Sequence, residues 1–470
     1  MNDLGAIVLA AGKGTRMRSP RSKLLHPLLG EYLVYYPLRA LYDAGVRRLV
    51  IVVGHGADEV RAAIAGMAFL SDAKIDFVVQ EPQRGTGHAV QVALDGISAL
   101  EGVKAPPREW VIACGDSPHL DDKAIARLIE ARRGAKVVVL AARVADPTGY
   151  GRMIEESGRL ERIVEHKDAN ERERAVNVVN AGAYAVEHAF LSAAVKALQP
   201  KNAQNELYLT DIVPAAPAAE RKLCVADAPE CVLGVNSQHE LMRSTALVQA
   251  AIVRRWHEGG VTIEAEDVTI GPRVTIDPGA FIQRGVTLLG ATHVSAAAVI
   301  EHHAHLDNVR VAEGARVRAF TYAEDSEIGP RAQVGPVSRL RSGSVLEEGA
   351  EVGNFCEVKK TRVKAKAKAH HVSYLGDAEI GSGTNIGAGT IICNYNGFTK
   401  PFSRIGADVF IGSNSTLVAP VNIEDRAYVA AGSVITEPVP SDALALGRAR
   451  QTNKDGYAKE LKERLKKDKK

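Results

Sequence analysis

The chain has 470 residues, which is enough for two or three domains. Hydrophobic residues make up 46% of it and charged residues 24%, the balance of a soluble globular protein. With 59 Lys plus Arg against 56 Asp plus Glu, the net charge gives no indication of a nucleic-acid partner.

The N-terminus and the cysteines together predict a cytoplasmic protein. The first apolar run, residues 6–11, is short and has no basic lead, so we expect neither a signal peptide nor a membrane span. The five cysteines are an odd number and include no CxxC pair. They are typical of reduced thiols rather than of a disulfide framework or a zinc site.

A glycine-rich stretch near the start, residues 5–23, reads GAIVLAAGKGTRMRSPRSK. Its apolar run predicts a buried strand, and Gly12 and Gly14 allow a tight turn whose N–H groups can face a ligand. Met17 stands where a dinucleotide fingerprint needs a third glycine, and the Walker spacing is absent. Three cations beside the turn suit a nucleoside triphosphate: Lys13, Arg16 and Lys23.

Short apolar runs alternate with amphipathic stretches over the first half of the chain. We predict strands at 6–11, 48–53, 75–80, 110–114 and 136–141, and helices at 37–44, 57–65, 89–94 and 122–132. This alternation favours a mainly parallel sheet covered on both faces, with ligands at the carboxyl ends of its strands.

Polar residues follow the third and fourth predicted strands. The Gln80 amide offers a donor and an acceptor that match the edge of a pyrimidine, with Gly85 and Thr86 close by, although an ordinary turn explains this segment equally well. Asp116, after Cys114-Gly115, suits a magnesium ligand, and its alternative is a helix N-cap or turn.

A helix over 239–259 is expected to join the two halves of the chain, because apolar residues recur there at helical spacing before Gly259-Gly260. Asn236 lies just before this helix. It could hold a metal, but Ser237 and Glu240 have the spacing of a capping box, so both roles stay open.

Past residue 260 the hydrophobic period changes to six, which is an internal repeat and predicts a solenoid of short parallel strands. The repeat forms three runs: Ile270, Ile276, Ile282, Leu288, Val294, Ile300 and Leu306; Ile328, Val334, Leu340, Leu346, Val352 and Val358; and Ile405, Ile411, Leu417, Ile423, Val429 and Ile435.

The repeat loses phase at 358–380 and again at 392–405, and we expect a loop at each place. The first break holds His370, His371 and Tyr374, close to the cations Arg341 and Lys359. A histidine beside cations suits removal of a proton from the amine of a phosphorylated substrate, since an unperturbed imidazole titrates near ~6.5. The alternative is a solvated, lysine-rich loop without a role.

The strings LAAGKGTRM and SKLLHPLLG resemble the signature of sugar-phosphate nucleotidylyltransferases, and TGYGRM, IVEHKD, NVVNAG and GVNSQHEL resemble N-acetylglucosamine-1-phosphate uridylyltransferases. The resemblance implies that Lys13, Arg16 and Lys23 assist catalysis and that Asp116 and Asn236 hold Mg²⁺. Cys114 departs from the family pattern. The nucleotide and nucleotide-sugar site implied in this way comprises Leu9, Ala10, Ala11, Gly12, Lys23, Gln80, Gly85, Thr86, Cys114, Gly115, Asp116, Gly151, Glu165, Asn180 and Asn236.

The strings RLRSG, VGNFCEVKK, HVSYLGDAEIG, NIGAGT and CNYNG resemble the glucosamine-1-phosphate N-acetyltransferase half of a bifunctional enzyme family. The resemblance implies a left-handed β-helix of hexapeptide repeats with His371 as catalytic base; the adjacent His370 departs from the family pattern. The implied glucosamine 1-phosphate site is Arg341, Lys359, Tyr374 and Asn385. The implied acetyl-CoA site is Ala388, Asn394, Tyr395, Ser413, Ala431 and Arg448.

The resemblance therefore predicts a Rossmann-like nucleotidyltransferase domain at 1–238, a linker helix at 239–259 and a β-helix domain at 260–470 that ends in a basic tail, a solvated helix or frayed segment. It implies acetyl transfer from acetyl-CoA to glucosamine 1-phosphate, then uridylyl transfer from UTP with Mg²⁺. The product would feed peptidoglycan and lipopolysaccharide precursors. A cytoplasmic homotrimer without nucleic-acid or membrane partners is expected. The alternatives are a non-catalytic scaffold with these folds, or an enzyme for another sugar or base.

Overall fold

The computed structural model describes residues 3–54, 56–99 and 106–468, so Lys469 and Lys470 of the basic tail lie outside the described residues. The chain divides into two compact units, Met1–Ala251 and Ile252–Lys470. The boundary between the units falls inside the helix α7, Gln238–Glu258. No helix in the described parts of the chain combines the length and apolar character needed to cross a membrane.

The first unit is built on a nine-stranded mixed sheet in which the order of the main path is β11-β7-β10-β6-β1-β4-β5. The strands are β1 Leu4–Ala10, β4 Arg48–Val53, β5 Lys74–Val79, β6 Glu109–Cys114, β7 Val137–Arg143, β8 Arg152–Glu156, β9 Arg159–Val164, β10 Val178–Glu187 and β11 Arg221–Val225. β1 pairs in parallel with β4 and β6, whereas β10 runs antiparallel to both β6 and β7. The mainly parallel sheet is confirmed, and β10, which the alternation pattern did not reveal, is the antiparallel member of its main path. β8 and β9 add further antiparallel pairings beside β10.

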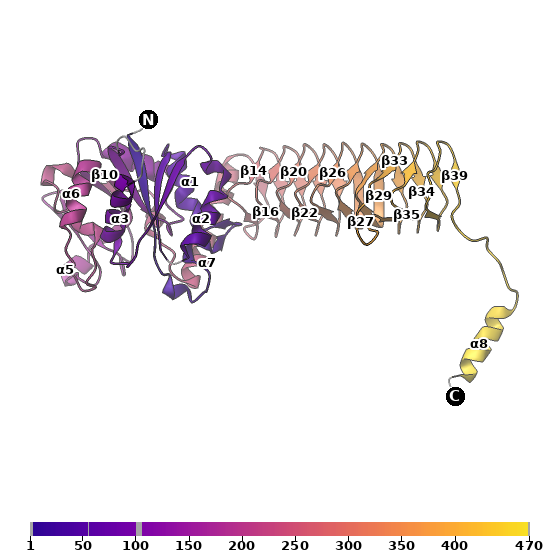
Figure 1. Ribbon diagram of the computed structural model, residues 1–470, viewed down its shortest axis with the longest axis horizontal. Helices are drawn as coiled ribbons and strands as arrows, with labels where there is room; N and C mark the ends of the chain where they lie inside the picture. Colours follow the sequence, from indigo (N-terminus) through magenta and orange to yellow (C-terminus); the bar gives the residue numbers. More distant parts are fainter. Residues whose placement is uncertain (1–2, 55, 100–105, 469–470) are drawn as a thin grey trace. The chain divides into compact units, whose positions relative to one another are not determined.

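Helices cover both faces of this sheet (Figure 1). Along β1, Ala6 and Val8 belong to one hydrophobic core and Ile7 to the other, which is why the strand reads as a continuous apolar run. The helices are α1 Tyr35–Asp43, α2 Ala57–Ala65, α3 Thr86–Ala99, α4 Asp122–Ala131, α5 Glu171–Arg174 and α6 His188–Ala197. The 3-10 turns are Thr15–Met17, Lys23–Leu25, Ala68–Leu70, Leu209–Ile212, Ala218–Glu220 and Pro229–Val232, and a small hairpin pairs β2 Pro27–Leu28 with β3 Glu31–Tyr32.

The second unit is a left-handed parallel β-helix of hexapeptide repeats whose coils stack one on the next (Figure 1). Ile270 pairs with Leu288, which pairs with Leu306, so a full coil takes 18 residues, or three hexapeptides, and some coils are one residue shorter. These aliphatic side chains are fully buried, and they form the ladder that fills the coils. The predicted solenoid is confirmed.

Each coil contributes one short strand to each of three faces. Face A comprises β13 Thr269–Ile270, β16 Thr287–Leu289, β19 His305–Asp307, β22 Tyr322–Glu324, β25 Arg339–Arg341, β32 Ile391–Cys393, β35 Thr416–Val418 and β38 Val434–Ile435. Face B comprises β12 Thr262–Ile263, β15 Phe281–Ile282, β18 Val299–Ile300, β21 Arg316–Val317, β24 Gln333–Val334, β31 Asn385–Ile386, β34 Phe410–Ile411, β37 Tyr428–Val429 and β39 Leu444–Ala445. Face C comprises β14 Thr275–Ile276, β17 His293–Val294, β20 Arg310–Val311, β23 Glu327–Ile328, β26 Val345–Leu346, β28 Arg362–Val363, β30 Ala378–Ile380, β33 Ser403–Ile405 and β36 Asn422–Ile423.

The expectation of a loop at the first break of the repeat is wrong. Residues 368–376 form one continuous strand, β29 (Lys368–Gly376), paired with β27 (Glu351–Lys359), and both strands run from face B round the corner to face A. The coil here is one residue short, since Val363 pairs with Ile380. A missing turn residue shifts the phase of the six-residue hydrophobic repeat, as an inserted loop also does.

The second break is a true insertion. Ile380 pairs with Ile405, far beyond the normal coil length, and residues 394–402 leave the solenoid as a loop. Phe398 in this loop is 94% exposed, so the loop presents a large apolar side chain to solvent. The chain ends in α8, Tyr457–Lys467, an exposed helix that carries the lysine-rich segment.

Candidate active sites

The first unit has a cavity of about 470 Å³ at the carboxyl ends of β1, β5 and β6. The glycine-rich loop forms one wall of it and the segment after β5 forms another. The predicted nucleotide residues gather here: Leu9, Ala10, Ala11, Gly12, Lys13, Lys23, Gln80, Gly85, Thr86, Cys114 and Asp116. We call this space the nucleotide cavity.

A second cavity of about 440 Å³ adjoins the first and shares Cys114 and Asp116 with it. It is lined by four residues of the implied nucleotide and nucleotide-sugar site, Gly151, Glu165, Asn180 and Asn236. Arg16 lines this second cavity rather than the nucleotide cavity. We call this space the sugar cavity. A pair of adjoining cavities that meet at one carboxylate suits a reaction between two bound substrates.

Lys23 lies at the junction of the two cavities. Its ammonium forms an ion pair with Asp116 and also donates to Asn236 Oδ1 at 3.1 Å. The Lys23 side chain is 10% exposed and that of Asp116 19% exposed. Two acceptor oxygens from distant parts of the sequence thus converge on one cationic group.

The two roles left open for Asn236 are compatible in the structure. Ser237 Oγ accepts from the Glu240 N–H at 3.2 Å, and the Glu240 carboxylate accepts from the Asn236 N–H at 2.6 Å, so these two side chains cap α7. The Asn236 Oδ1 stays directed at Lys23. Val235 N–H donates to the Asp116 carbonyl at 2.9 Å and fixes the two segments side by side.

Cys114 faces a backbone carbonyl, with its Sγ 3.8 Å from Gly182 O. Burial raises the pKa of this thiol to about 12, so it is neutral at physiological pH. Gly115 N–H donates to Leu9 O at 2.9 Å, and a Cβ at Gly115 would approach that oxygen within 3.3 Å. The Cys-Gly pair therefore joins the ends of β6 and β1 closely and brings Asp116 to the cavity.

The base-side residues are held by contacts within the protein. Gln80 is 5% exposed, and its Nε2 donates to Gly85 O at 3.0 Å and lies 3.2 Å from His88 Nδ1. The Thr86 hydroxyl oxygen accepts from Leu209 N–H at 3.1 Å. Thr86 therefore already uses its hydroxyl within the protein, in addition to lining the cavity.

In the sugar cavity, Asn180 N–H donates to Gly151 O at 2.8 Å. The Asn180 side chain donates to Tyr184 Oη at 2.7 Å and accepts from Gly182 N–H at 2.9 Å, so it shapes its own turn. Burial, together with the nearby Asp168 and Asp211, raises the pKa of Glu165 above its ordinary range. A carboxyl group held in this way is suited to a sugar, because it can accept hydrogen bonds from the sugar's hydroxyl groups.

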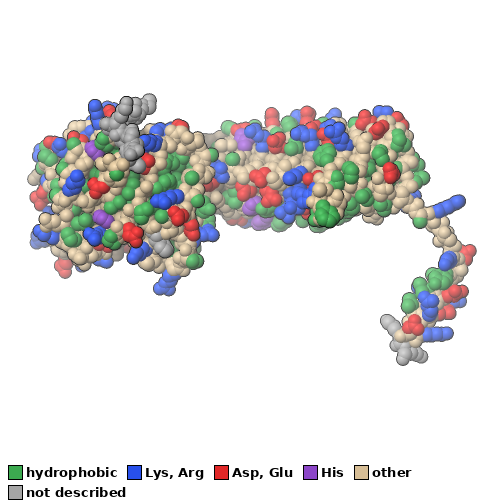
Figure 2. Space-filling model, in the orientation of Figure 1, with side chains coloured by type: hydrophobic (Ala, Val, Ile, Leu, Met, Phe, Trp, Pro, Cys, Tyr) green, Lys and Arg blue, Asp and Glu red, His purple; other side chains and the backbone are tan. Residues whose placement is uncertain are grey.

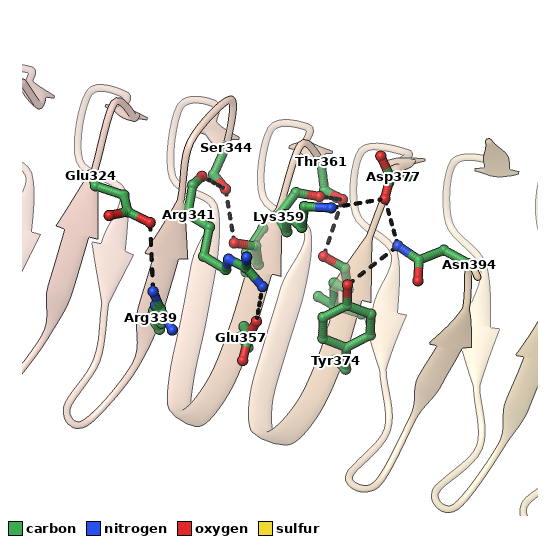
Figure 3. A network of polar contacts seen from close by, with 12 residues as sticks. Glu324, Arg339, Arg341, Ser344, Glu357, Lys359, Thr361, Tyr374, Asp377 and Asn394 are labelled. Atoms are coloured by element: carbon green, nitrogen blue, oxygen red, sulfur yellow. Dashed lines mark hydrogen bonds and ion pairs between the residues drawn. The ribbon is translucent and has the colours of Figure 1, made fainter. Parts of the chain in front are cut away.

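The second unit has a polar network on face A that joins four of the predicted residues (Figure 3). Arg341 Nη1 pairs with Glu357 at 2.9 Å, and Lys359 Nζ lies 3.7 Å from Asp377. Asn394 Nδ2 donates to Asp377 at 2.5 Å and lies 3.3 Å from Tyr374 Oη, so Asp377 links β27, β29 and the insertion. Arg341 and Lys359 occupy paired positions on neighbouring strands.

His371 lies outside this network, at the corner between faces B and A. Its partner across the ladder is Asn354, and it is exposed, whereas His370 Nε2 lies 2.8 Å from the Glu351 carboxylate.

A column of residues runs along this corner from one coil to the next. Ala369 pairs with Ile386, Ile386 with Ile411 and Ile411 with Val429. Two residues beyond these partners stand His371, Ala388, Ser413 and Ala431, which we call the corner column.

The corner column is continuous from coil to coil. Asn414 N–H donates to Ala388 O at 2.7 Å and Gly432 N–H donates to Ser413 O at 2.8 Å. Three of the residues assigned to acetyl-CoA thus follow His371 in line. Arg448 is exposed just past the end of this line, Tyr395 is 62% exposed on the insertion, and Asn385 lies on β31 of face B, away from the face A network.

The polar residues at these sites that escaped the sequence reasoning include Gln83, Glu206, Glu357, Asp377 and Lys400. Gln83 Nε2 donates to Ala11 O, and Glu206 lines the nucleotide cavity. Contact with Lys359 lowers the pKa of the Lys400 ammonium, with further repulsion from Arg341, so three cations gather at one place. Asp377 follows β29 in the string YLGD, a signal that strand-end reasoning could have used.

The fold and the two sites define a class of two-unit transferases, a nucleotidyltransferase joined to a hexapeptide β-helix. The MobA-like NTP transferase domain matches residues 6–200, and the hexapeptide repeat of succinyl-transferase matches residues 403–437. The chain is 45% identical to "Bifunctional protein GlmU" of Sorangium cellulosum (strain So ce56), over 98% of each chain. It is 44% identical to proteins of the same name from Nitratidesulfovibrio vulgaris (strain DSM 19637 / Miyazaki F), over 95% of this chain and 97% of the other, and from Anaeromyxobacter sp. (strain Fw109-5), over 97% and 92%.

The chain belongs to the family of bifunctional GlmU proteins. The similarity confirms the resemblance expected from the motifs, and with it the pairing of two transferase activities in one enzyme. A non-catalytic scaffold with the same folds is therefore not favoured.

Proposed function

We propose that this chain makes UDP-N-acetylglucosamine in two steps. The second unit transfers acetyl from acetyl-CoA to glucosamine 1-phosphate, and the first unit joins the product to UTP and releases pyrophosphate. The observation that carries the proposal is that each unit gathers its own set of predicted residues: two cavities meet at Asp116 in the first, and a corner column begins at His371 in the second.

A phosphate oxygen of the sugar phosphate would attack the α-phosphorus of UTP as the bond to pyrophosphate breaks. The nucleotide cavity holds UTP and the sugar cavity holds the attacking group, so the two meet beside Asp116. Lys13 and Arg16 are exposed on the glycine-rich loop, one toward each cavity, and would stabilise the negative charge of the reacting phosphates.

The residues at the junction fit Mg²⁺. Carboxylate and amide oxygens are its usual protein ligands, and one or two of them suffice when substrate phosphates supply the rest. Asp116 and Asn236 Oδ1 already converge on one cation, the Lys23 ammonium. When bound, Mg²⁺ neutralises charge on the α-phosphate. Asp116 and Asn236 would hold it, and Lys23 would then turn from these oxygens to the phosphates.

For acetyl transfer, His371 takes a proton from the substrate amine as the nitrogen attacks the thioester carbonyl. The C–N bond forms, the C–S bond breaks and the CoA sulfur leaves. The corner column supports this role, because the half-buried Ala388 and the exposed Ser413 and Ala431 offer a line along which acetyl-CoA can lie with its thioester end at His371. Arg341, Lys359 and Lys400 would bind the sugar phosphate, whose charge the three cations match.

We also propose that the chain assembles as a homotrimer through the β-helix. A ridge of apolar residues runs along the same corner one position past the column: Phe320, Val337, Phe355 and Val372, exposed by 54, 43, 61 and 55%. Phe355 N–H donates to Val337 O, and Val337 N–H to Ala319 O, so the ridge is continuous. Exposed bulky residues at positive φ, as Phe320, Val337 and Phe355 are, favour a buried contact in an assembly. The number of three copies rests on the resemblance to hexapeptide enzymes.

A cytoplasmic location is part of the proposal, and all five cysteines are free thiols in keeping with it. On the face that Figure 2 shows, acidic and basic side chains are intermixed over both units, which suits small-molecule substrates rather than a nucleic acid.

Two single substitutions test the proposal by separating the activities. Asp116→Ala removes a carboxylate from the proposed metal and phosphate site, so we expect uridylyl transfer to fall by roughly 10²-fold or more with acetyl transfer unchanged. Loss of both activities in a folded variant would contradict separate sites. Each half-reaction is measured alone, with N-acetylglucosamine 1-phosphate as the substrate for the first.

His371→Ala should do the reverse and lower the turnover number of acetyl transfer by roughly 10²–10⁴-fold, the usual effect of losing a general base. His370→Ala is the matched control, because His370 is paired with Glu351 and lies next along the strand. Acetyl transfer unchanged in His371→Ala but lost in His370→Ala would move the base to His370.

A further inference from the structure

The orientation of the Gln80 amide is fixed by two protein contacts. Its nitrogen donates to Gly85 O at 3.0 Å and lies 3.2 Å from His88 Nδ1. A carbonyl oxygen only accepts hydrogen bonds, so the nitrogen end of the amide, and not the oxygen end, must face Gly85.

The same geometry fixes the state of His88. Because the amide nitrogen only donates, Nδ1 must accept, which requires a neutral ring with its proton on Nε2. Burial and the charge of Arg84 lower the pKa of His88, and its place in the first turn of α3 favours the neutral ring further.

Both N–H groups of the amide are therefore used within the protein. Gln80 lines the nucleotide cavity although it is only 5% exposed, and Oε1 is the polar atom of the side chain left to face a base. We propose that His88 is a positioning residue which, with the Gly85 carbonyl, holds Gln80 so that the cavity offers the base an acceptor only.

This arrangement selects between pyrimidines. Uracil presents an N3–H group, whose hydrogen bond Gln80 Oε1 accepts. Cytosine instead presents an N3 acceptor, so two lone pairs face each other and two buried acceptors, N3 and Oε1, stay unsatisfied. A freely rotating amide would satisfy either base by turning over. The inference rests on the proposed uridylyl transfer and adds to it the residue that sets the choice of base.

The test compares UTP with CTP as substrates of the full-length wild type, His88→Leu and His88→Asn. Leu cannot accept from Gln80, so we expect the KM for UTP to rise and the UTP-to-CTP ratio of kcat/KM to fall roughly 10-fold or more, with kcat at saturating UTP little changed. The Asn Oδ1 stands close to where Nδ1 was and accepts likewise, so His88→Asn should keep the wild-type ratio.

Two results would overturn the inference: an unchanged ratio in His88→Leu, or an equal loss in His88→Asn. If His88→Leu does not fold, N3-methyl-UTP decides with the wild type, which should use it roughly 10-fold less well or worse than UTP, because the methyl group removes the donor. Equal use of the two would refute the acceptor-only reading. If the wild type transfers no uridylyl group at all, the proposed function fails, and calorimetric binding of UTP and CTP to the same proteins still decides the role of His88.

Discussion

The side chains at the junction of the two cavities come from the beginning, the middle and the end of the first unit. Lys23 follows the glycine-rich loop, Asp116 follows β6, and Asn236 precedes α7, yet all three meet. The sequence singled out each of these residues: Lys23 beside the glycine-rich turn, Asp116 after a predicted strand, and Asn236 just before the linker helix. Their mutual contact was not predictable from spacing, because it depends on β1 and β6 lying side by side in the sheet.

Glu165 gives a prediction about pH. Its pKa is raised by burial and by Asp168 and Asp211, so the folded state keeps the proton to higher pH than the unfolded chain does. The stability that this group contributes is present below the ordinary glutamate pKa of ~4.3 and is lost as pH rises through the raised value. We therefore expect Glu165→Gln to raise the Tm of the first unit at neutral pH and to change it little in acid, as followed by calorimetry.

Glu173→Gln serves as the control of opposite sign. The Asn170 N–H and the Arg162 guanidinium lower the pKa of Glu173. The charged form of Glu173 therefore stabilises the fold at pH values above the ordinary glutamate pKa, and removing this charge lowers the Tm at neutral pH. A lower Tm for Glu165→Gln at neutral pH would contradict the account. If Glu165 binds the sugar, the same variant also shows a higher KM for N-acetylglucosamine 1-phosphate.

At the scale of elements, the hexad period identified the β-helix, because only one face of each short strand can fill the coil. The same pattern failed at β29, where one missing turn residue looked like a loop. Glu357 was missed because it is an ordinary strand residue in sequence, and Asp377 because the strand that it follows, β29, was expected to be a loop. Only the stacking of coils places them against Arg341 and Lys359.

The ladder itself predicts where the β-helix is sensitive. Leu417 is fully buried in its coil, whereas Leu444 near the last coil is 60% exposed. Leu417→Ala should cost about 2–5 kcal/mol of unfolding free energy, because it leaves a cavity between coils. Leu444→Ala should stay within about 0.5 kcal/mol. Urea titration followed by far-UV circular dichroism measures both, and equal effects would mean that the ladder is not the core.

At the scale of the whole molecule, the proposed trimer contact at the ridge, on the corner between faces B and A, would link assembly to catalysis. Phe355→Asp puts a charge on the ridge and should shift the protein from trimer to monomer in light scattering. Acetyl transfer should fall with it, since Val372 of the ridge adjoins His371. Leu465→Asp, on the exposed helix α8 and 55% exposed, is the matched control and should leave the trimer intact. A trimeric Phe355→Asp would exclude the ridge as the contact.

The central claim is that one chain carries both reactions. The most direct measurement is a mass-spectrometric assay of the purified protein with glucosamine 1-phosphate, acetyl-CoA, UTP and Mg²⁺, each omitted in turn. We predict that UDP-N-acetylglucosamine forms only when all four are present. Product that forms only after N-acetylglucosamine 1-phosphate replaces the first two would make the second unit a scaffold, and no product in either mixture would contradict the claim for both units.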